Sequence, residues 1–168
     1  MMKTIIKVND FFRTFGVYIS GLAIFAMMWI IVIDVFMRNI FNKPLVGTYE
    51  IVQYYLMPLA IFPALAFAYW SGVLPRLSEL ISKLPESVQR FHRWLILLIE
   101  LLIFTLMTYY GFLFAISGLQ ESMAIPVGGK LLLVWPVYFL VPIGFFFVLV
   151  EVIFRLLKQS TAKGEVNV

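Results

Sequence analysis

Apolar residues fall into four long runs along the chain, separated by shorter polar stretches. The runs cover roughly residues 14–37, 51–70, 94–118 and 131–154. A hydrocarbon core of about 30 Å is crossed by about 20 residues of helix, so each run is long enough to span a membrane. The alternating segments of about ten residues that are typical of membrane β-barrels are not seen. The pattern therefore predicts four membrane-spanning helices.

Residues 73–91, between the second and third runs, follow a different pattern. Apolar positions such as Val73, Leu77 and Leu84 recur at three- and four-residue spacing, and polar residues fill the opposite face. We expect a short amphipathic helix that lies flat in the membrane interface. The alternative is an extension of the third span beyond the membrane. Either way the expected fold is an all-α integral membrane protein, with residues 1–168 forming a single membrane domain.

Composition supports a membrane protein and excludes several kinds of chemistry. The chain is 62% hydrophobic and only 13% charged, whereas soluble domains are about 45–50% apolar and about 25% charged. It has no cysteine, which excludes thiol chemistry and thiolate metal sites, and its one histidine, His92, lies outside the apolar runs. We therefore predict no catalytic residue, no metal site and no cofactor in this chain. The first run is longer than the apolar core of a signal peptide, so we expect it to remain as a helix.

Lysine and arginine residues are distributed unevenly between the two sides of the predicted spans. Ten lie on the side of the two termini and of the loop between the second and third runs. The other side has only Arg38, Lys43 and Lys130. The positive-inside rule then places both termini in the cytoplasm. This asymmetry also accounts for the net charge of +4 without a nucleic-acid partner.

Charged residues within or next to the apolar runs are costly and often functional. Asp34 and Arg38 are four residues apart near the outer end of the first run, and Glu151 and Arg155 repeat this spacing near the inner end of the fourth. Each acid can pair with the base one turn later on its own helix. Glu100 has no base at that spacing. We expect it to be protonated or to meet a polar group on another helix or protein.

Small residues and prolines indicate where the helices pack closely or bend. Gly16, Ser20 and Ala23 share one face of the first run, which permits a close helix contact. Pro58 and Pro63 interrupt the second run. Because proline frees backbone carbonyls, bends at these positions need neighbouring partners or a local rearrangement of the helix.

The segment of residues 34–45, DVFMRNIFNKPL, followed by Gly47 and Glu50, resembles a known signature. It is similar to that of the small membrane subunit of tripartite ATP-independent periplasmic (TRAP) transporters, the DctQ-type proteins. The resemblance extends over essentially the whole chain through the four spans and the inner amphipathic segment. Members of that family often have a stretch with glycine and histidine after the second span, whereas residues 69–74 of this chain read YWSGVL, which has a glycine and no histidine.

The resemblance implies a non-catalytic partner of a larger transporter in a bacterial or archaeal cytoplasmic membrane. A large multi-span subunit would carry the substrate and sodium sites, and a periplasmic binding protein would deliver an organic acid such as a dicarboxylate, sialic acid or another sugar acid. The charged residues then become candidates for a subunit interface or an internal structural contact: Asp34, Arg38, Glu50, Glu100, Glu151 and Arg155. Candidates for contact with the binding protein are Arg38, Lys43 and Lys130.

Two other functions fit the same sequence. The chain is short enough to be a self-contained multidrug-type exporter that exchanges protons for cations, with Glu100 as the coupling carboxylate. It also fits a non-catalytic subunit of a membrane enzyme. The first would transport without a partner, and the second would require a bound cofactor that is visible in the absorption spectrum of the purified protein.

Overall fold

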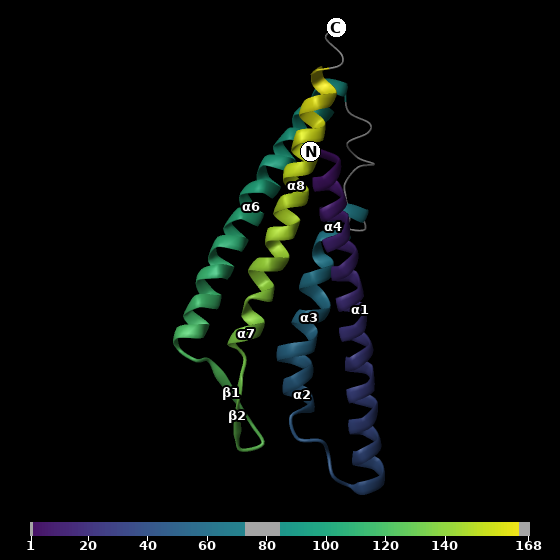
Figure 1. The fold of residues 1–168 in the computed structure, drawn as a ribbon, viewed down its shortest axis with the longest axis vertical. Helices are drawn as coiled ribbons and strands as arrows, with labels where there is room; N and C mark the ends of the chain where they lie inside the picture. Colours follow the sequence, from purple (N-terminus) through teal and green to yellow (C-terminus); the bar gives the residue numbers. More distant parts are fainter. Residues whose placement is uncertain (1, 73–84, 165–168) are drawn as a thin grey trace.

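The chain folds into a bundle of long helices, as seen in a computed structural model that describes residues 2–72 and 85–164 (Figure 1). Four helical segments within these residues are long and apolar enough to cross a membrane: Asn9–Phe41, Thr48–Ser71, Phe91–Gln120 and Trp135–Leu157. The predicted helical membrane fold is confirmed. The described residues near the two termini lie toward the same end of the bundle. We call this the inner end and the opposite one the outer end, following the orientation expected from the lysine and arginine distribution.

The second span consists of several short helical pieces, whereas the other three are long helices. In chain order the elements are α1 (Met2–Phe41), α2 (Thr48–Ile51), the π-helical turn η1 (Val52–Leu56), α3 (Met57–Ile61), the 3₁₀ turn η2 (Phe62–Ala64), α4 (Leu65–Ser71), α6 (Glu86–Gln120), the strands β1 (Ala124–Val127) and β2 (Lys130–Leu133), α7 (Trp135–Tyr138) and α8 (Leu140–Gly164).

The two breaks in the second span occur next to its prolines. Pro58 follows the π turn directly, and Pro63 lies within the 3₁₀ turn. A proline nitrogen cannot donate a hydrogen bond, so the backbone adopts wider and tighter turns in place of regular α-helix. This is the local rearrangement that the prolines lead us to expect.

The 3₁₀ turn lies between two glycines from neighbouring helices. A Cβ atom built on Gly16 of α1 would lie 2.2 Å from the carbonyl oxygen of Pro63, and one on Gly144 of α8 would lie 2.8 Å from that of Phe62. Only glycine permits backbones to approach so closely. Ser20 and Ala23, on the same face of α1 as Gly16, are also buried. The close contact expected of this face is confirmed.

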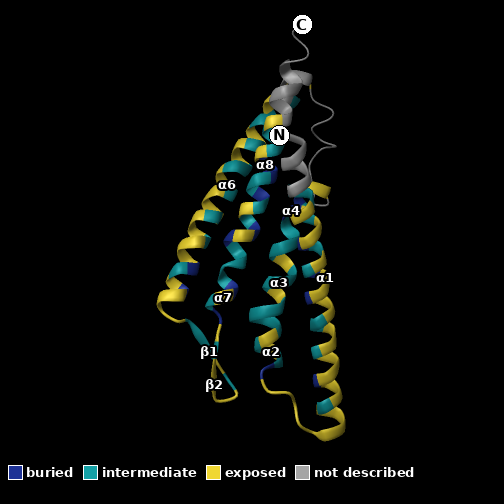
Figure 2. Cartoon of the chain, in the orientation of Figure 1, coloured by how far each residue is buried: buried dark blue, intermediate teal, exposed yellow. Residues whose placement is uncertain are grey.

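The largest cluster of buried residues joins α4 to α8 in the inner half of the bundle. Ala66 and Tyr69 contact Val148 and Val152, and Leu97, Leu101 and Phe104 of α6 pack against them. Exposed residues cover the outward sides of the helices (Figure 2). The molecule therefore has a narrow core and a wide apolar surface, as expected of a chain that lies in lipid.

A β-hairpin precedes the fourth span and was not expected from the sequence. Residues 131–133, assigned by hydropathy to the fourth apolar run, belong to β2, and the helical part of the span begins at Trp135. The strands are antiparallel, with Val127 opposite Lys130. Gly128 and Gly129 connect them with φ angles of 56° and 82°. Two consecutive positive φ angles form the tight turn that glycine pairs favour in hairpins.

Most of the expected amphipathic helix lies outside the described residues, which resume at residue 85. Its last part is described. α6 begins at Glu86 and continues without interruption into the third span. From Glu86 onward, the segment is therefore an extension of that span, which was the alternative reading of the sequence.

Candidate functional site

Asp34 is buried at the outer end of α1 and accepts two hydrogen bonds. Its Oδ2 lies 2.7 Å from Nη2 of Arg38, and its Oδ1 accepts the backbone N–H of Leu45 at 2.8 Å. The pairing with Arg38 confirms the expectation from their four-residue spacing. The bond to Leu45 was not expected, and it attaches the end of α1 to the loop that leads into the second span.

The residues between Arg38 and Glu50 explain how the chain turns here. Asn42, just after α1, has a φ of 50°, and Gly47, just before α2, has a φ of 90°. Both values lie in the left-handed region that asparagine and glycine adopt most readily. Thr48 Oγ1 donates to the carbonyl of Leu45 at 3.2 Å. Much of the signature segment is therefore accounted for by the closure of this loop around Asp34.

An open pocket of about 330 Å³ lies beside this loop. Its lining residues are Ile31, Asp34, Arg38, Leu45, Gly47, Thr48, Tyr49, Glu50 and Val52. Glu50 lies in the first turn of α2, where a carboxylate is favoured by the helix dipole. Among the described residues, no ion pair or hydrogen bond reaches its carboxylate. The structure thus brings Glu50 to the same pocket as Asp34 and Arg38 without joining it to either.

The three cationic residues expected to face a binding protein lie on segments at the outer end. The side chain of Arg38 remains 64% exposed although it pairs with Asp34. Lys43, in the loop, and Lys130, next to the hairpin turn, are both exposed. The two segments touch: a Cβ on Gly47 would meet Val127 at 2.6 Å, and a Cβ on Gly128 would meet Val46 at 2.3 Å.

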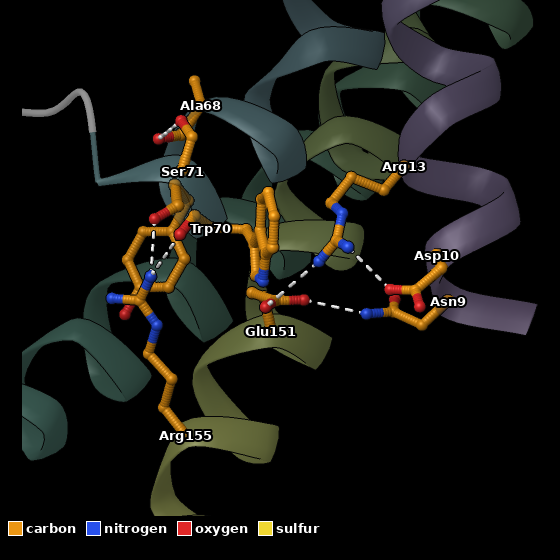
Figure 3. A network of polar contacts seen from close by, with 9 residues as sticks. Asn9, Asp10, Arg13, Ala68, Trp70, Ser71, Glu151 and Arg155 are labelled. Carbon is orange, nitrogen blue, oxygen red and sulfur yellow. Dashed lines mark hydrogen bonds and ion pairs between the residues drawn. The ribbon is translucent and has the colours of Figure 1, made fainter. Parts of the chain in front are cut away.

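A second polar cluster lies at the inner end, and it corrects one expectation. Glu151 and Arg155 do not pair with each other, although their spacing permits it. Glu151 instead accepts a hydrogen bond at Oε2 from Nδ2 of Asn9 at 2.8 Å, and its Oε1 lies 3.7 Å from Nη1 of Arg13 (Figure 3). Arg13 also pairs with Asp10 at 2.6 Å. Tertiary contacts with α1 therefore replace the expected contact within α8.

Arg155 binds the carboxyl end of α4. Its Nη2 donates to the carbonyl oxygens of Tyr69 at 2.7 Å and of Trp70 at 3.2 Å. Its guanidinium lies 4.2 Å from the centre of the Tyr69 ring, and that of Arg13 lies 3.7 Å from the centre of the Trp70 ring. The last carbonyls of a helix have no partner within it and carry partial negative charge, so a guanidinium is well suited to bind them.

Glu100 is joined to the same cluster through Tyr69, whose hydroxyl donates a hydrogen bond to Oε2 of the glutamate. The expectation of a polar partner on another helix is confirmed. We use the term inner-end network for the residues of these contacts: Asn9, Asp10, Arg13, Tyr69, Trp70, Glu100, Glu151 and Arg155. They come from α1, α4, α6 and α8, so the inner-end network connects all four spans.

Sequence reasoning missed the contribution of Arg13, Asn9 and the Tyr69–Trp70 pair to this network. Arg13 was only one of the ten lysine and arginine residues from which the orientation was predicted. The available signal was weak, because Asn9 and Glu151 are 142 positions apart and no spacing rule relates them. Among the residues that the structure describes, no three His, Asp or Glu side chains are grouped as a metal site.

A protein-family model matches most of the chain. The family model described as tripartite ATP-independent periplasmic transporters, DctQ component, matches residues 27–162. The comparison with curated proteins gave no match. The matched region includes the Asp34 loop, Glu100, the hairpin and Arg155, and begins after the α1 residues of the inner-end network.

Proposed function

The chain belongs to the DctQ component family of tripartite ATP-independent periplasmic transporters, and from that premise we propose that it is a supporting subunit without a transport site of its own. In this proposal a large membrane subunit carries out sodium-driven import of an organic acid, which a periplasmic binding protein delivers. The small subunit holds the large one in a fixed position in the cytoplasmic membrane, with both termini in the cytoplasm.

The observation that carries this proposal is that contacts within the chain hold the spans together at both ends. The inner-end network connects four spans, and Asp34 fixes the loop at the outer end. The hydroxyl of Tyr55 also donates to the carbonyl of Leu133, which attaches the second span to the hairpin. A subunit held in this way is suited to a static role.

The packing of the 3₁₀ turn in the second span supports the same role. Transporters often bind substrate at helix breaks near the middle of the membrane, where freed backbone groups line a cavity. Here the backbone of Phe62 and Pro63 lies directly against Gly16 and Gly144, at distances that leave no room for a Cβ atom. The 3₁₀ turn is thus used for helix packing, and its carbonyls face neighbouring helices.

For the outer end we propose contact with the binding protein. Arg38, Lys43 and Lys130 are exposed there on two segments that touch each other. A surface with three cations and a tight hairpin would attract an acidic surface on the delivered protein, mainly by raising the rate of encounter. Reversing the charge at Lys43 and Lys130 should then slow uptake most at low salt.

Reconstitution in vesicles tests the main proposal. This chain alone should take up no organic acid, whereas the chain together with the large subunit, the binding protein and a sodium gradient should do so. Uptake by the isolated chain would contradict the supporting role.

A Glu100→Gln variant separates this role from that of a proton-coupled exporter. The amide oxygen of glutamine can still accept the Tyr69 hydroxyl, so we expect uptake by the full complex to change little. A complete loss of uptake with a normal yield of complex would instead indicate that Glu100 carries protons.

A further inference from the structure

Two adjacent tyrosines on α6 are exposed. Tyr109 is 59% exposed and Tyr110 is 63% exposed. Their rings contact each other edge to face, with centres 5.4 Å apart. No hydrogen bond from the described part of the chain reaches either hydroxyl. Both hydroxyls therefore need a donor or acceptor from outside this chain.

These tyrosines lie near the middle of the third span. The third span extends from Phe91 to Gln120, so its midpoint is near residue 105. At a rise of 1.5 Å per residue, Tyr109 is about 5 Å and Tyr110 about 7 Å from that midpoint, well inside a hydrocarbon core of about 30 Å. Helical side chains lean toward the amino end of their helix, which brings the hydroxyls closer still to the middle of the span. Tyrosines that face lipid usually lie at the membrane boundary, where water and headgroups bind the hydroxyl.

The tyrosines lie on the side of α6 that this chain leaves uncovered. One stripe of α6 packs against the rest of the bundle, with Leu97, Leu101 and Phe104 on the core and Gly111 against Pro142. The other side is exposed along the length of the helix (Figure 2). We call it the tyrosine face, and its residues are Leu95, Ile99, Leu102, Leu106, Tyr109, Tyr110 and Leu113.

Lipid hydrocarbon cannot provide hydrogen bonds for the two hydroxyls of the tyrosine face. Its leucines and isoleucine are equally suited to lipid or to a protein, so they do not identify what covers them. The hydroxyls indicate a protein, because a hydroxyl without a hydrogen bond in an apolar medium carries a large desolvation cost. A protein can supply a carbonyl or side-chain oxygen at this depth, whereas a lipid tail cannot.

Tyr18 on α1 provides a useful contrast. It is 74% exposed, more than either tyrosine of α6. However, it lies about 10 Å from the middle of its own span, Asn9–Phe41, and its side chain leans toward the inner end. Its hydroxyl can reach the membrane boundary, so its exposure is explained without a protein partner.

We propose that the tyrosine face is the surface through which this chain binds the large membrane subunit, with oxygen atoms of that subunit accepting the hydroxyls of Tyr109 and Tyr110. This inference rests on the supporting role proposed above and adds the helix face that performs it. The large subunit is the partner with enough membrane-embedded surface to cover a face that extends over several turns of α6.

Removing the two hydroxyls tests the inference by the sign of the effect. A variant with Tyr109→Phe and Tyr110→Phe keeps both rings. If oxygens of the large subunit accept the hydroxyls, they lose their donors, and the amount of large subunit that co-purifies should fall several-fold. If lipid covers the face, phenylalanine is the better residue, and an unchanged or higher yield would overturn the inference. Tyr18→Phe is the matched control and should retain the wild-type yield. The elution profile of each isolated variant checks its fold.

Site-specific crosslinking identifies the neighbour directly. A photoreactive phenylalanine at Leu106, which lies on the tyrosine face, should form an adduct with the large subunit in the assembled complex. The same group at Leu22 on α1, which is 69% exposed, is the control and should form none. An adduct between two copies of this chain, no adduct, or equal adducts from both positions would overturn the inference. If the wild-type chain fails to co-purify with the large subunit at all, the supporting role itself has failed.

Discussion

Asp34 and Arg38 form one ion pair, yet their replacement should have very different consequences. The side chain of Asp34 is 8% exposed, and that of Arg38 is 64% exposed. Asp34 also accepts the backbone N–H of Leu45, a bond in which Arg38 has no part. We therefore expect Asp34→Ala to open the loop between the first two spans and Arg38→Ala to leave it closed.

The structure allows the two effects to be estimated. A hydrogen bond to a charged group contributes about 1.5–3 kcal/mol, and Asp34→Ala removes such an acceptor from the Leu45 N–H. An exposed pair at four-residue spacing on a helix contributes about 0.3–0.5 kcal/mol. In Arg38→Ala, Asp34 keeps the Leu45 N–H and borders an open pocket that water can enter. The free energy of unfolding should thus fall several times more in Asp34→Ala than in Arg38→Ala.

An exchanged variant, Asp34→Arg with Arg38→Asp, makes the comparison stricter. It preserves an ion pair on the same helix, but arginine has no acceptor for the Leu45 N–H. We expect it to be no more stable than Asp34→Ala. The measurement is denaturant unfolding of the purified chain in mixed micelles, followed by tryptophan fluorescence. Equal losses in the two single variants, or full recovery in the exchanged one, would show that the ion pair and not the loop bond determines stability.

Three further changes test other contacts. Gly16→Val should lower the free energy of unfolding by at least about 1–3 kcal/mol, because its Cβ would collide with the Pro63 carbonyl. A Cβ atom on Gly21 would meet no atom within 4 Å, so Gly21→Val should stay within about 0.5 kcal/mol of wild type in the same assay. Arg155→Lys keeps the charge but loses the planar guanidinium that binds two carbonyls and stacks on the Tyr69 ring. The free energy of unfolding should therefore fall by about 0.5–1.5 kcal/mol. A lysine variant as stable as wild type would mean that the charge alone is sufficient. A reporter enzyme inserted at Gly129 should be active in the periplasm and one at the carboxyl end of the chain in the cytoplasm; periplasmic activity from the latter would reverse the assigned orientation.

The sequence was sufficient for the four spans, because about 20 consecutive apolar residues have few alternatives to a membrane helix. It also predicted which face of α1 packs closely against a neighbouring helix, because small residues recur there at helical spacing. The hairpin was missed because hydropathy extended the fourth apolar run back to residue 131. A local signal was present, because the pair Gly128 and Gly129 stands between Val127 and the apolar residues 131–133, although Pro126 weakens the strand pattern.

The charged residues show where sequence reasoning fails. Four-residue spacing correctly paired Asp34 with Arg38, because the other hydrogen bond of Asp34, from the Leu45 N–H, uses a different carboxylate oxygen. The same rule wrongly paired Glu151 with Arg155, because Arg13 and the terminal carbonyls of α4 are better partners once the helices pack. A spacing rule describes what one helix permits. It contains no information on which groups the other helices bring within reach.

The inner-end network has a consequence for the order in which the chain is assembled. The bond between Asp34 and Leu45 spans 11 positions, so it can form as soon as the ribosome has released the first loop. The bond between Asn9 and Glu151 spans 142 positions and needs nearly the whole chain to be synthesised. Until then, Arg13 has only its local partner Asp10 and the aromatic ring of Trp70. The packing of Gly16 against Pro63 can hold α1 once the second span is made, but its polar contacts at the inner end remain incomplete until the last span is inserted. That span supplies Glu151, which accepts Asn9 and lies beside Arg13.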